Sequence, residues 1–500
     1  AAERVAEMLD VEPAPRLVSP LAYDSKTKLF VLFGGDHGDY LMNDTWTFDP
    51  ATTRWTHRNP KTAPAPRGNH SLKANGDGTV TLAGGHYYTS STDYVGAQYK
   101  QFADGDWTYD IAADVWKGST PGETPDIRVY RKGPYVPEFF WTGPAPDPKA
   151  TAKAFAELPA NRWVEMKDAH QPRMERTWGH AVLDPDGDRI LVFGGGHSAH
   201  GGSDVLHFHL STCRWELPFA VEFPLGQLYS NTSYPEGFNI NGRPWVTGHT
   251  YQNYNYDLVT QKMYFAGHHH ECYVYDPDKG DWTGRIPKPK GMTYDSCFYT
   301  LNLTQTPLGL YCWTGRGEMF SLVGKDWQPM PTTGVKLPTS SVDSSTYVYD
   351  SKRDRFLFFR ADYGKPFSGE ITALDRKTAV ASKLAPKNLD AFVGRKVTDP
   401  FDRAVYDPEH DLVLFATYVP GDPATVRRTV AYDCAGDRWV TLNLDYAIEG
   451  KRALQPRGPG HSCGLMFDAR RKLLWGCDTH SCRVYALRFD PMTADMRPIE

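Results

Sequence analysis

A stretch rich in histidine and glycine, FGGGHSAHGGSDVLHFHL at residues 193–210, suggests imidazole chemistry. Of the 17 histidines in the chain, four lie in this stretch, directly after a glycine triplet. Imidazole transfers protons near neutral pH and binds transition metals. His197 and His200 follow the glycines closely. His207 and His209 alternate along the next predicted strand, so we expect them to share one face and to have a structural role.

Arginine and tyrosine accompany histidine in several short motifs, among them RGNH (67–70), RTWGH (176–180) and RGPGH (457–461). Guanidinium groups bind carboxylates through paired hydrogen bonds, and tyrosine adds flat aromatic surface and a phenol. A structural alternative is that these arginines bind loop carbonyls and that any single histidine holds neighbouring loops together. The candidate catalytic residues are His180, His200, Tyr251 and His70, and the candidate substrate-binding residues are Arg67, Arg176, His197, Tyr87, Arg316, Arg360 and His86.

This set of side chains favours β-elimination on a uronic-acid polymer, which would make the protein a polysaccharide lyase. Arginine would neutralise the sugar carboxylate, and histidine or tyrosine would remove the C5 proton and protonate the leaving oxygen. We expect His180 or His200 as base or acid, with Tyr251 as its partner. A carbohydrate-binding or scaffold protein without catalysis is the main alternative.

A second group of residues could hold a metal ion. His268, His270 and Cys272 alternate, so on an extended strand they face the same way, and His249 could add a fourth ligand. Imidazole and thiolate suit Zn²⁺ or Cu²⁺. A zinc or other divalent metal site, structural or catalytic, is therefore a third hypothesis, and no nucleotide cofactor is expected.

A repeated pattern of strands positions these residues. Eight segments read as two strands joined by a turn of Asp, Asn, Gly or Pro, for example AYDSKTKLFVLFGG (22–35) and LDPDGDRILVFGG (183–195). Many are followed by a third strand, another turn and a closing tryptophan, as in NDTWTFDPATTRW (43–55). Four strands per unit of roughly 45–60 residues is the period of a propeller blade.

The paired glycines and the later aromatic–Asp…Trp pattern resemble the Kelch repeat, from about Arg16 to Asp495. The resemblance implies an all-β propeller of four-stranded antiparallel blades, with eight blades favoured and seven as the alternative. The superfamily includes copper-radical oxidases, but their Tyr-His dipeptide is missing from this sequence. The fold carries both enzymes and binding modules, so the similarity to propeller lyases that use His, Tyr and Arg is an analogy.

Antiparallel pairing of the first two strands in a blade predicts where the site lies. The first strand begins, and the second strand ends, at the same face of the disc. The motifs listed above would therefore converge on one mouth of the central channel. We expect the site over the second to fourth units, because those carry histidine at both ends of the hairpin.

Segments outside the repeats define the predicted domain organisation. We expect a helical segment at 1–15 and a propeller at 16–500, with insertions at 118–172 and 217–244 that shape the site. The first insertion contains a helix-like patch, ATAKAFAEL (150–158).

Two pairs of cysteines are predicted to lie opposite each other between first and second strands. Cys297 would face Cys312, and Cys463 would face Cys477, so we expect at least one disulfide if the protein is exported.

Composition limits the classes of function. The net charge of −5 argues against a nucleic-acid partner, which needs a basic surface, and no apolar run is long enough to span a membrane. We expect a monomer that acts on an acidic polysaccharide or oligosaccharide. A removed signal peptide would make it secreted or periplasmic.

Overall fold

A computed structural model describes most of the repeated segments of the chain. The described residues are 13, 16, 18–36, 41–58, 60–88, 99–118, 137–140, 143–166, 176, 179–195, 203–219, 243–244, 250, 252–267, 271–289, 292, 301–339, 345–360, 368–389, 404–418, 429–446, 463–479 and 482–499. The expected helical segment at 1–15 and most of the second expected insertion lie outside them, so those predictions stay untested.

The described residues form eight mainly antiparallel sheets of four or five strands, as the repeats predict. The first two sheets are formed by β1 (Leu21–Asp24), β2 (Leu29–Asp36), β3 (Leu41–Asp49) and β4 (Arg54–Arg58), and by β5 (Ser71–Ala74), β6 (Thr79–Ala83), β9 (Trp107–Asp110) and β10 (Val115–Gly118). A separate two-stranded sheet of β7 (His86–Tyr88) and β8 (Tyr99–Gln101) lies between β6 and β9 in the sequence.

Six further sheets follow along the chain. Their principal strands are β13 (His180–Asp184), β14 (Arg189–Phe193), β15 (Val205–His209) and β16 (Arg214–Leu217); β17 (Tyr254–Asp257), β18 (Lys262–Phe265), β19 (Glu271–Asp276) and β20 (Asp281–Pro287); β21 (Leu301–Thr306), β22 (Gly309–Thr314), β23 (Met319–Val323) and β24 (Asp326–Met330); β26 (Ser345–Asp350), β27 (Arg355–Arg360), β28 (Ile371–Asp375) and β29 (Val380–Lys383); β30 (Ala404–Asp407), β31 (Leu412–Tyr418), β32 (Thr429–Asp433) and β33 (Arg438–Leu442); β35 (Cys463–Asp468), β36 (Leu473–Asp478), β37 (Arg483–Leu487) and β12 (Arg162–Glu165).

Short strands extend the outer edges of several sheets. They are β11 (Glu138–Phe139) on β16, β25 (Thr333–Gly334) on β29, β34 (Asp445–Tyr446) on β12 and β38 (Arg497–Pro498) on β33.

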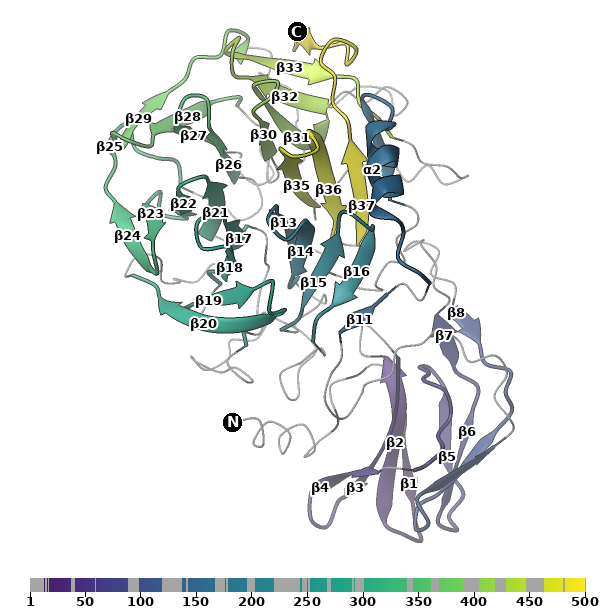
Figure 1. The fold of residues 1–500 in the computed structure, drawn as a ribbon. Coiled ribbons are helices and arrows are strands. Elements are labelled where there is room, and N and C mark those ends of the chain that lie inside the picture. The colour runs from purple at the N-terminus through teal and green to yellow at the C-terminus, as the bar shows by residue number, and fades with distance from the viewer. Residues whose placement is uncertain are drawn as a thin grey trace.

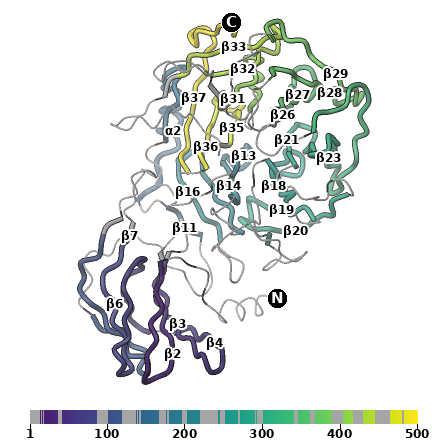
Figure 2. The backbone as a smooth tube through the Cα atoms, turned by 180° about the vertical axis from the view of Figure 1, so that it is seen from behind, coloured from purple at the N-terminus to yellow at the C-terminus, as the bar shows by residue number. Residues whose placement is uncertain are grey.

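The first strands of these six sheets follow one another in a circle. β13 packs beside β17, β17 beside β21, β21 beside β26, β26 beside β30, β30 beside β35, and β35 beside β13 again. The sheets therefore have a propeller-like arrangement around a common centre (Figure 1). The first two sheets pack on each other through β1 and β5 and lie to one side of this ring in both views (Figure 2). The number of sheets equals the eight predicted repeats, but a propeller of eight or seven blades is not confirmed.

The ring is closed by a strand from the expected insertion at 118–172. β12 pairs antiparallel with β37, so residues 162–165 supply the fourth strand of the sheet that carries the C-terminal strands. This explains why the last repeat lacks its own closing tryptophan: Trp163, buried in β12, takes that place. A salt bridge also joins the last sheet to the first sheet of the ring. Arg471, in the turn between β35 and β36, binds Asp188, in the turn between β13 and β14, at 2.7 Å.

A local backbone signal marks the closing strands. In four sheets an Arg-Trp or Val-Trp pair begins the fourth strand directly after a residue with positive φ, namely Thr53, Asp114, Cys213 and Asp437. Asn161-Arg162-Trp163 has the same form, with φ of 58° at Asn161, and asparagine tolerates the left-handed conformation better than most residues. The motif was present in the sequence and predicts β12.

The remaining features agree in part with expectation. The helix-like patch forms α2 (Pro148–Ala156), capped by Asp147 and anchored by buried Phe155 against Trp475.

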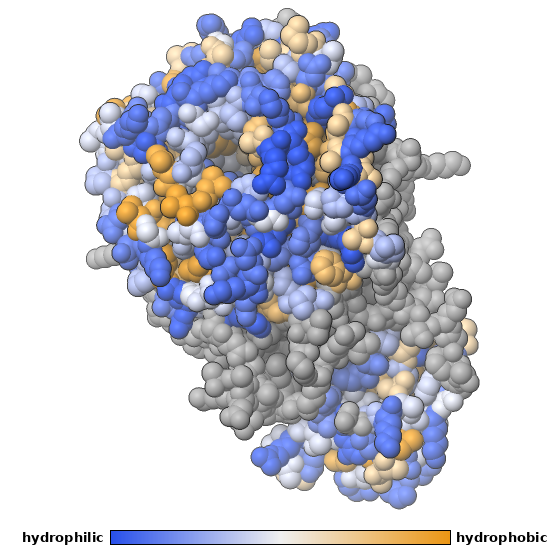
Figure 3. All heavy atoms as spheres, in the orientation of Figure 1, coloured by the Kyte–Doolittle hydropathy of each residue, from blue (hydrophilic) through white to orange (hydrophobic). Residues whose placement is uncertain are grey.

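The face in Figure 3 is largely polar, with apolar residues gathered over the sheet of β21–β24, where Leu308 and Val323 are exposed. The described residues include no helix with the length and apolar character needed to cross a membrane.

The cysteine pairing predicted from the turns is wrong. The strand register sets Cys463 opposite Asp478 and Gly464 opposite Cys477, so the two cysteines project from opposite faces of the sheet. Cys312 lies opposite Leu303, and neither Cys312 nor Cys477 forms a disulfide with another described residue. Cys297 lies outside the described residues.

Candidate functional site

The start of the first strand and the end of the second do meet at one end of each sheet. His180 is opposite Phe193, Leu301 is opposite Thr314, and Ser345 is opposite Arg360. This end of the six sheets, where their first strands begin, is called the mouth of the ring below.

Three buried arginines form the same contact in successive repeats. Arg16, Arg67 and Arg176 donate to the carbonyls of Gly34, Gly84 and Gly194, which lie 18, 17 and 18 positions later. The same guanidinium groups bind the carboxylates of Asp44, Asp104 and Asp204, each at 2.5 Å. Each arginine therefore links the end of the second strand of its sheet to residues at or just before the start of the third strand.

These contacts correct the substrate-binding role expected for Arg67 and Arg176. Both side chains are 0% exposed, and Arg67 also lies 3.8 Å from the centre of the Phe102 ring. A buried guanidinium neutralised by aspartate has no charge available for a polymer, so the alternative reading that these arginines bind loop carbonyls is confirmed. The glycines have φ of 56°, 63° and 69°, a conformation that turns the chain sharply and that other residues rarely adopt.

His180 is buried at the start of β13, against the neighbouring sheet. Its ring packs edge-on against Tyr254 with centroids 5.5 Å apart, and the Tyr254 hydroxyl donates to the His180 carbonyl. The side chain thus lies at the expected end of the ring but between two sheets.

His70 and His86 do not belong to the ring. They flank the glycine pair of the second sheet, where Gly68 and His86 form an isolated bridge. Burial, and then the charges of Arg67 and His86, lower the pKa of His70 to about 4, so this ring is neutral at pH 7. The prediction that these histidines surround the same mouth as His180 is therefore wrong.

Two other predicted arginines are exposed at the mouth. Arg316 lies in the turn after β22, and Arg360 ends β27. Their sheets are neighbours in the ring, since β21 packs beside β26. Exposed guanidinium groups on adjacent sheets can meet one anionic ligand, which the buried arginines cannot.

Buried polar side chains join sheets of the ring that are not neighbours. Gln252, which precedes β17, donates through Nε2 to Thr346 Oγ1 of β26 at 3.1 Å, and its carbonyl accepts from the Leu303 amide. The first bond reaches past the intervening sheet, so the side chains of non-adjacent sheets meet near the axis of the ring.

Most other predicted site residues cannot be placed. His197, His200, Tyr251, His249, His268 and His270 lie outside the described residues. Tyr87 belongs to β7, where its backbone pairs with Lys100. Cys272 is fully buried in β19, and burial, opposed by nearby Lys288, raises the pKa of its thiol to about 12. A metal ion at Cys272 would therefore have to displace a proton from a buried thiol.

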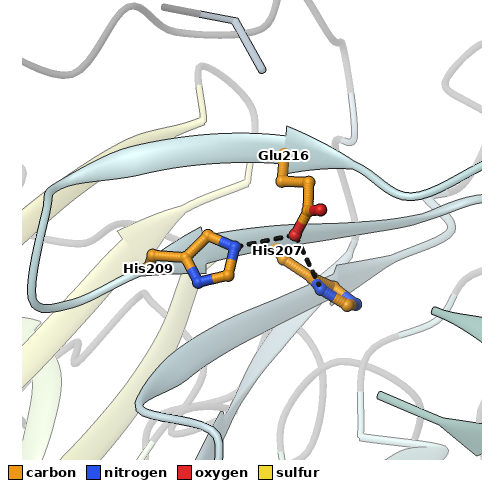
Figure 4. Close-up of side chains that lie close together, drawn as sticks. All are labelled: His207, His209 and Glu216. Carbon is orange, nitrogen blue, oxygen red and sulfur yellow. Dashed lines mark hydrogen bonds and ion pairs between the residues drawn. The ribbon is translucent and has the colours of Figure 1, made fainter. Parts of the chain in front are cut away.

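A compact cluster of His207, His209 and Glu216 was not predicted as a site. His207 and His209 share one face of β15, as expected, and Glu216 projects toward them from β16 (Figure 4). Glu216 Oε2 is 2.7 Å from His209 Nε2 and 3.5 Å from His207 Nδ1. The sequence contained a signal for this cluster: a His-x-His pair on one strand, and a glutamate on the next strand that pairs with the first histidine across the turn.

Comparison with known proteins adds no further guide to function. Neither the protein-family models nor the curated protein sequences gave a match to this chain. The functional argument therefore depends on the side chains and their placement.

Proposed function

We propose that the protein is a polysaccharide lyase that cleaves a uronic-acid-containing polymer by β-elimination at the mouth of the ring. The supporting observation is the pair of exposed arginines, Arg316 and Arg360, on neighbouring sheets at this end. Guanidinium groups suit the repeated carboxylates of such a polymer, since they bind them through two parallel hydrogen bonds. An exported protein would meet this substrate.

The chemistry assigns roles to the mouth residues. An arginine that pairs with the C5 carboxylate makes the C5 proton more acidic. A base removes that proton, the electron pair forms a C4–C5 double bond, and the C4–oxygen bond breaks as an acid protonates the leaving oxygen. His200 and Tyr251, which precede β15 and β17 in the sequence, remain the proposed base and acid. His180, which packs against Tyr254, is proposed to have a structural role at this end of the ring.

We also propose that the propeller has six blades. The circle of first strands and the closing strand β12 support this count, in place of the eight or seven blades expected from the repeats. The first two sheets would then form a separate unit before the propeller.

A screen of uronate polymers tests the activity. Turnover is followed by the ultraviolet absorbance of the new double bond. We expect activity on at least one polymer and a loss of roughly 10- to 100-fold in kcat/KM for Arg360→Met and for Arg316→Met, the range for hydrogen bonds to a charged group. Arg285→Met is the control, because Arg285 is exposed on β20 and pairs with Glu271. Activity that is equal in all three variants would contradict the proposed role of the mouth arginines.

Carbohydrate binding without catalysis is the second candidate. The burial of Arg67 and Arg176, which were expected to bind substrate, favours it, because fewer cations are left at the mouth to neutralise a sugar carboxylate during catalysis. Retention of an acidic polymer by the wild type, with no double bond formed on any polymer, would support binding alone.

A further inference from the structure

The cluster between β15 and β16 carries an inference independent of the mouth. We infer that His207, His209 and Glu216 bind one divalent transition-metal ion, with Zn²⁺ as the fitting probe. The ligand atoms of the three side chains lie within 4.8 Å of one another. Figure 4 shows both imidazole rings directed at the same carboxylate.

The spacing of the ligand atoms is close to that of a coordinated ion. Nitrogen and oxygen ligands about 2.0–2.1 Å from a tetrahedral zinc lie about 3.3 Å from one another. The 3.5 Å between His207 Nδ1 and Glu216 Oε2 is within about 0.2 Å of this value. The 2.7 Å hydrogen bond between His209 Nε2 and Glu216 Oε2 has to lengthen by only about 0.6 Å, within the reach of two partly exposed side chains.

One ligand atom is buried and has no hydrogen bond. His207 is 1% exposed, and its Nδ1 has no hydrogen-bond partner among the described residues, because Glu216 at 3.5 Å is too distant. A buried polar atom without a partner costs free energy, and a metal ion at this position would satisfy it.

The other ring nitrogen of His207 is held by the next sheet. Tyr275 of β19 lies with its hydroxyl 2.7 Å from His207 Nε2. Histidines that bind metals usually donate this second N–H to an oxygen, which fixes the ring and leaves the other nitrogen free to coordinate. The Tyr275 hydroxyl can accept from Nε2–H, and in that tautomer Nδ1 carries a lone pair that can coordinate a metal.

A cation beside the cluster is already paired with carboxylates. Arg189 of β14 lies opposite His209 in the sheet, and its guanidinium group is engaged by Asp184 and Asp278.

The site is open to solvent on one side. His209 is 25% and Glu216 is 17% exposed, so water can complete the coordination. Phe139 of β11 pairs with Glu216 and covers His209 at 6.0 Å. His209 is opposite Arg189, at the end of the sheet away from the mouth, which separates this site from the proposed lyase site. On binding, His209 Nε2 gives up the proton that lies between it and Glu216, and Nδ1 of the ring takes up a proton instead, so the imidazole stays neutral.

Zinc binding to the whole chain, measured by calorimetry in competition with a chelator, tests the inference. We expect the wild type to bind one more Zn²⁺ tightly than His209→Gln and Glu216→Gln do. Tyr275→Phe should weaken this site by about 10- to 100-fold, the usual effect of removing an outer-shell partner. Circular dichroism in chelator checks that the variants fold, and both ligand substitutions are at partly exposed residues.

His410→Gln is the matched control. His410 Nδ1 forms a 2.7 Å hydrogen bond with Asp407, the same distance as between His209 and Glu216, but without a second imidazole in a described cluster. We expect it to bind zinc as the wild type does. The same number of tight zinc sites in the wild type, His209→Gln and Glu216→Gln would overturn the inference, whether or not zinc binds elsewhere in the chain.

Discussion

Replacing Arg176 by methionine tests whether the arginines of the repeat hold the structure or bind substrate. The substitution keeps much of the side-chain volume but removes the charge, and leaves Asp204, which is 0% exposed, without its cation. It also removes the hydrogen bond to the Gly194 carbonyl. Breaking a buried ion pair from one side typically costs about 3–5 kcal/mol, because the remaining charge stays desolvated.

The magnitude can be checked with a double-mutant cycle. Asp204→Leu alone leaves a buried guanidinium and should cost a similar amount, about 3–5 kcal/mol. The double variant leaves no unpaired charge, so its loss of unfolding free energy should be clearly smaller than the sum of the two single losses. Urea unfolding followed by tryptophan fluorescence and circular dichroism gives these values, provided that the two probes report the same transition.

Arg360→Met is the control for the same chemical change. Arg360 is exposed at the same end of the ring, so its unfolding free energy should change by no more than about 0.5 kcal/mol while its turnover falls. A stable Arg176→Met variant that has lost only polymer binding would refute the reasoning and return Arg176 to the substrate-binding set.

Three further outcomes follow from the structure. Burial, and then neighbouring charges, lower the pKa of His70 to about 4, so its contribution to stability is complete above pH 6.5 and is lost as the pH falls toward 4. In His70→Phe the unfolding midpoint should therefore depend less on pH across that range. An unchanged pH dependence of the midpoint would contradict this prediction. A chain of residues 143–500 should melt as cooperatively as the full chain, whereas a chain of residues 167–500, which lacks β12, should not. Thermal melting followed by circular dichroism measures this difference. Equally cooperative melting of the two shortened chains would argue against closure of the ring by β12. Cys272 and Cys312, both fully buried, should react with a thiol reagent roughly 100-fold or more slowly in buffer than in denaturant, and rapid labelling of the folded chain would disprove their burial.

The metal cluster shows the limit of reading strands one at a time. Alternation along β15 predicted that His207 and His209 share a face, and that is confirmed. Their carboxylate comes from the fourth strand and the oxygen that holds His207 comes from Tyr275 in another sheet. The contact with Tyr275 depends on how two sheets pack together, and the alternation of residues along one strand does not predict that packing.

The sequence by itself determined the repeated hairpins. Asp-containing turns and alternating apolar residues encode strands and their order, because these are local properties of the backbone and of side-chain direction. Even the closing strand was encoded locally, in Asn161-Arg162-Trp163, although only its pairing with β37 showed what it closes.

Tertiary structure alone decided which repeats share the ring and which charges reach solvent. Arg176 and Arg360 are equally plausible anion-binding residues in the sequence, yet one is neutralised by Asp204 in the interior and the other is exposed. Likewise the motif of His70 resembles that of His180, but the two lie in different groups of sheets. The physical reason is that burial and pairing are properties of packed surfaces, which bring together residues far apart in the chain.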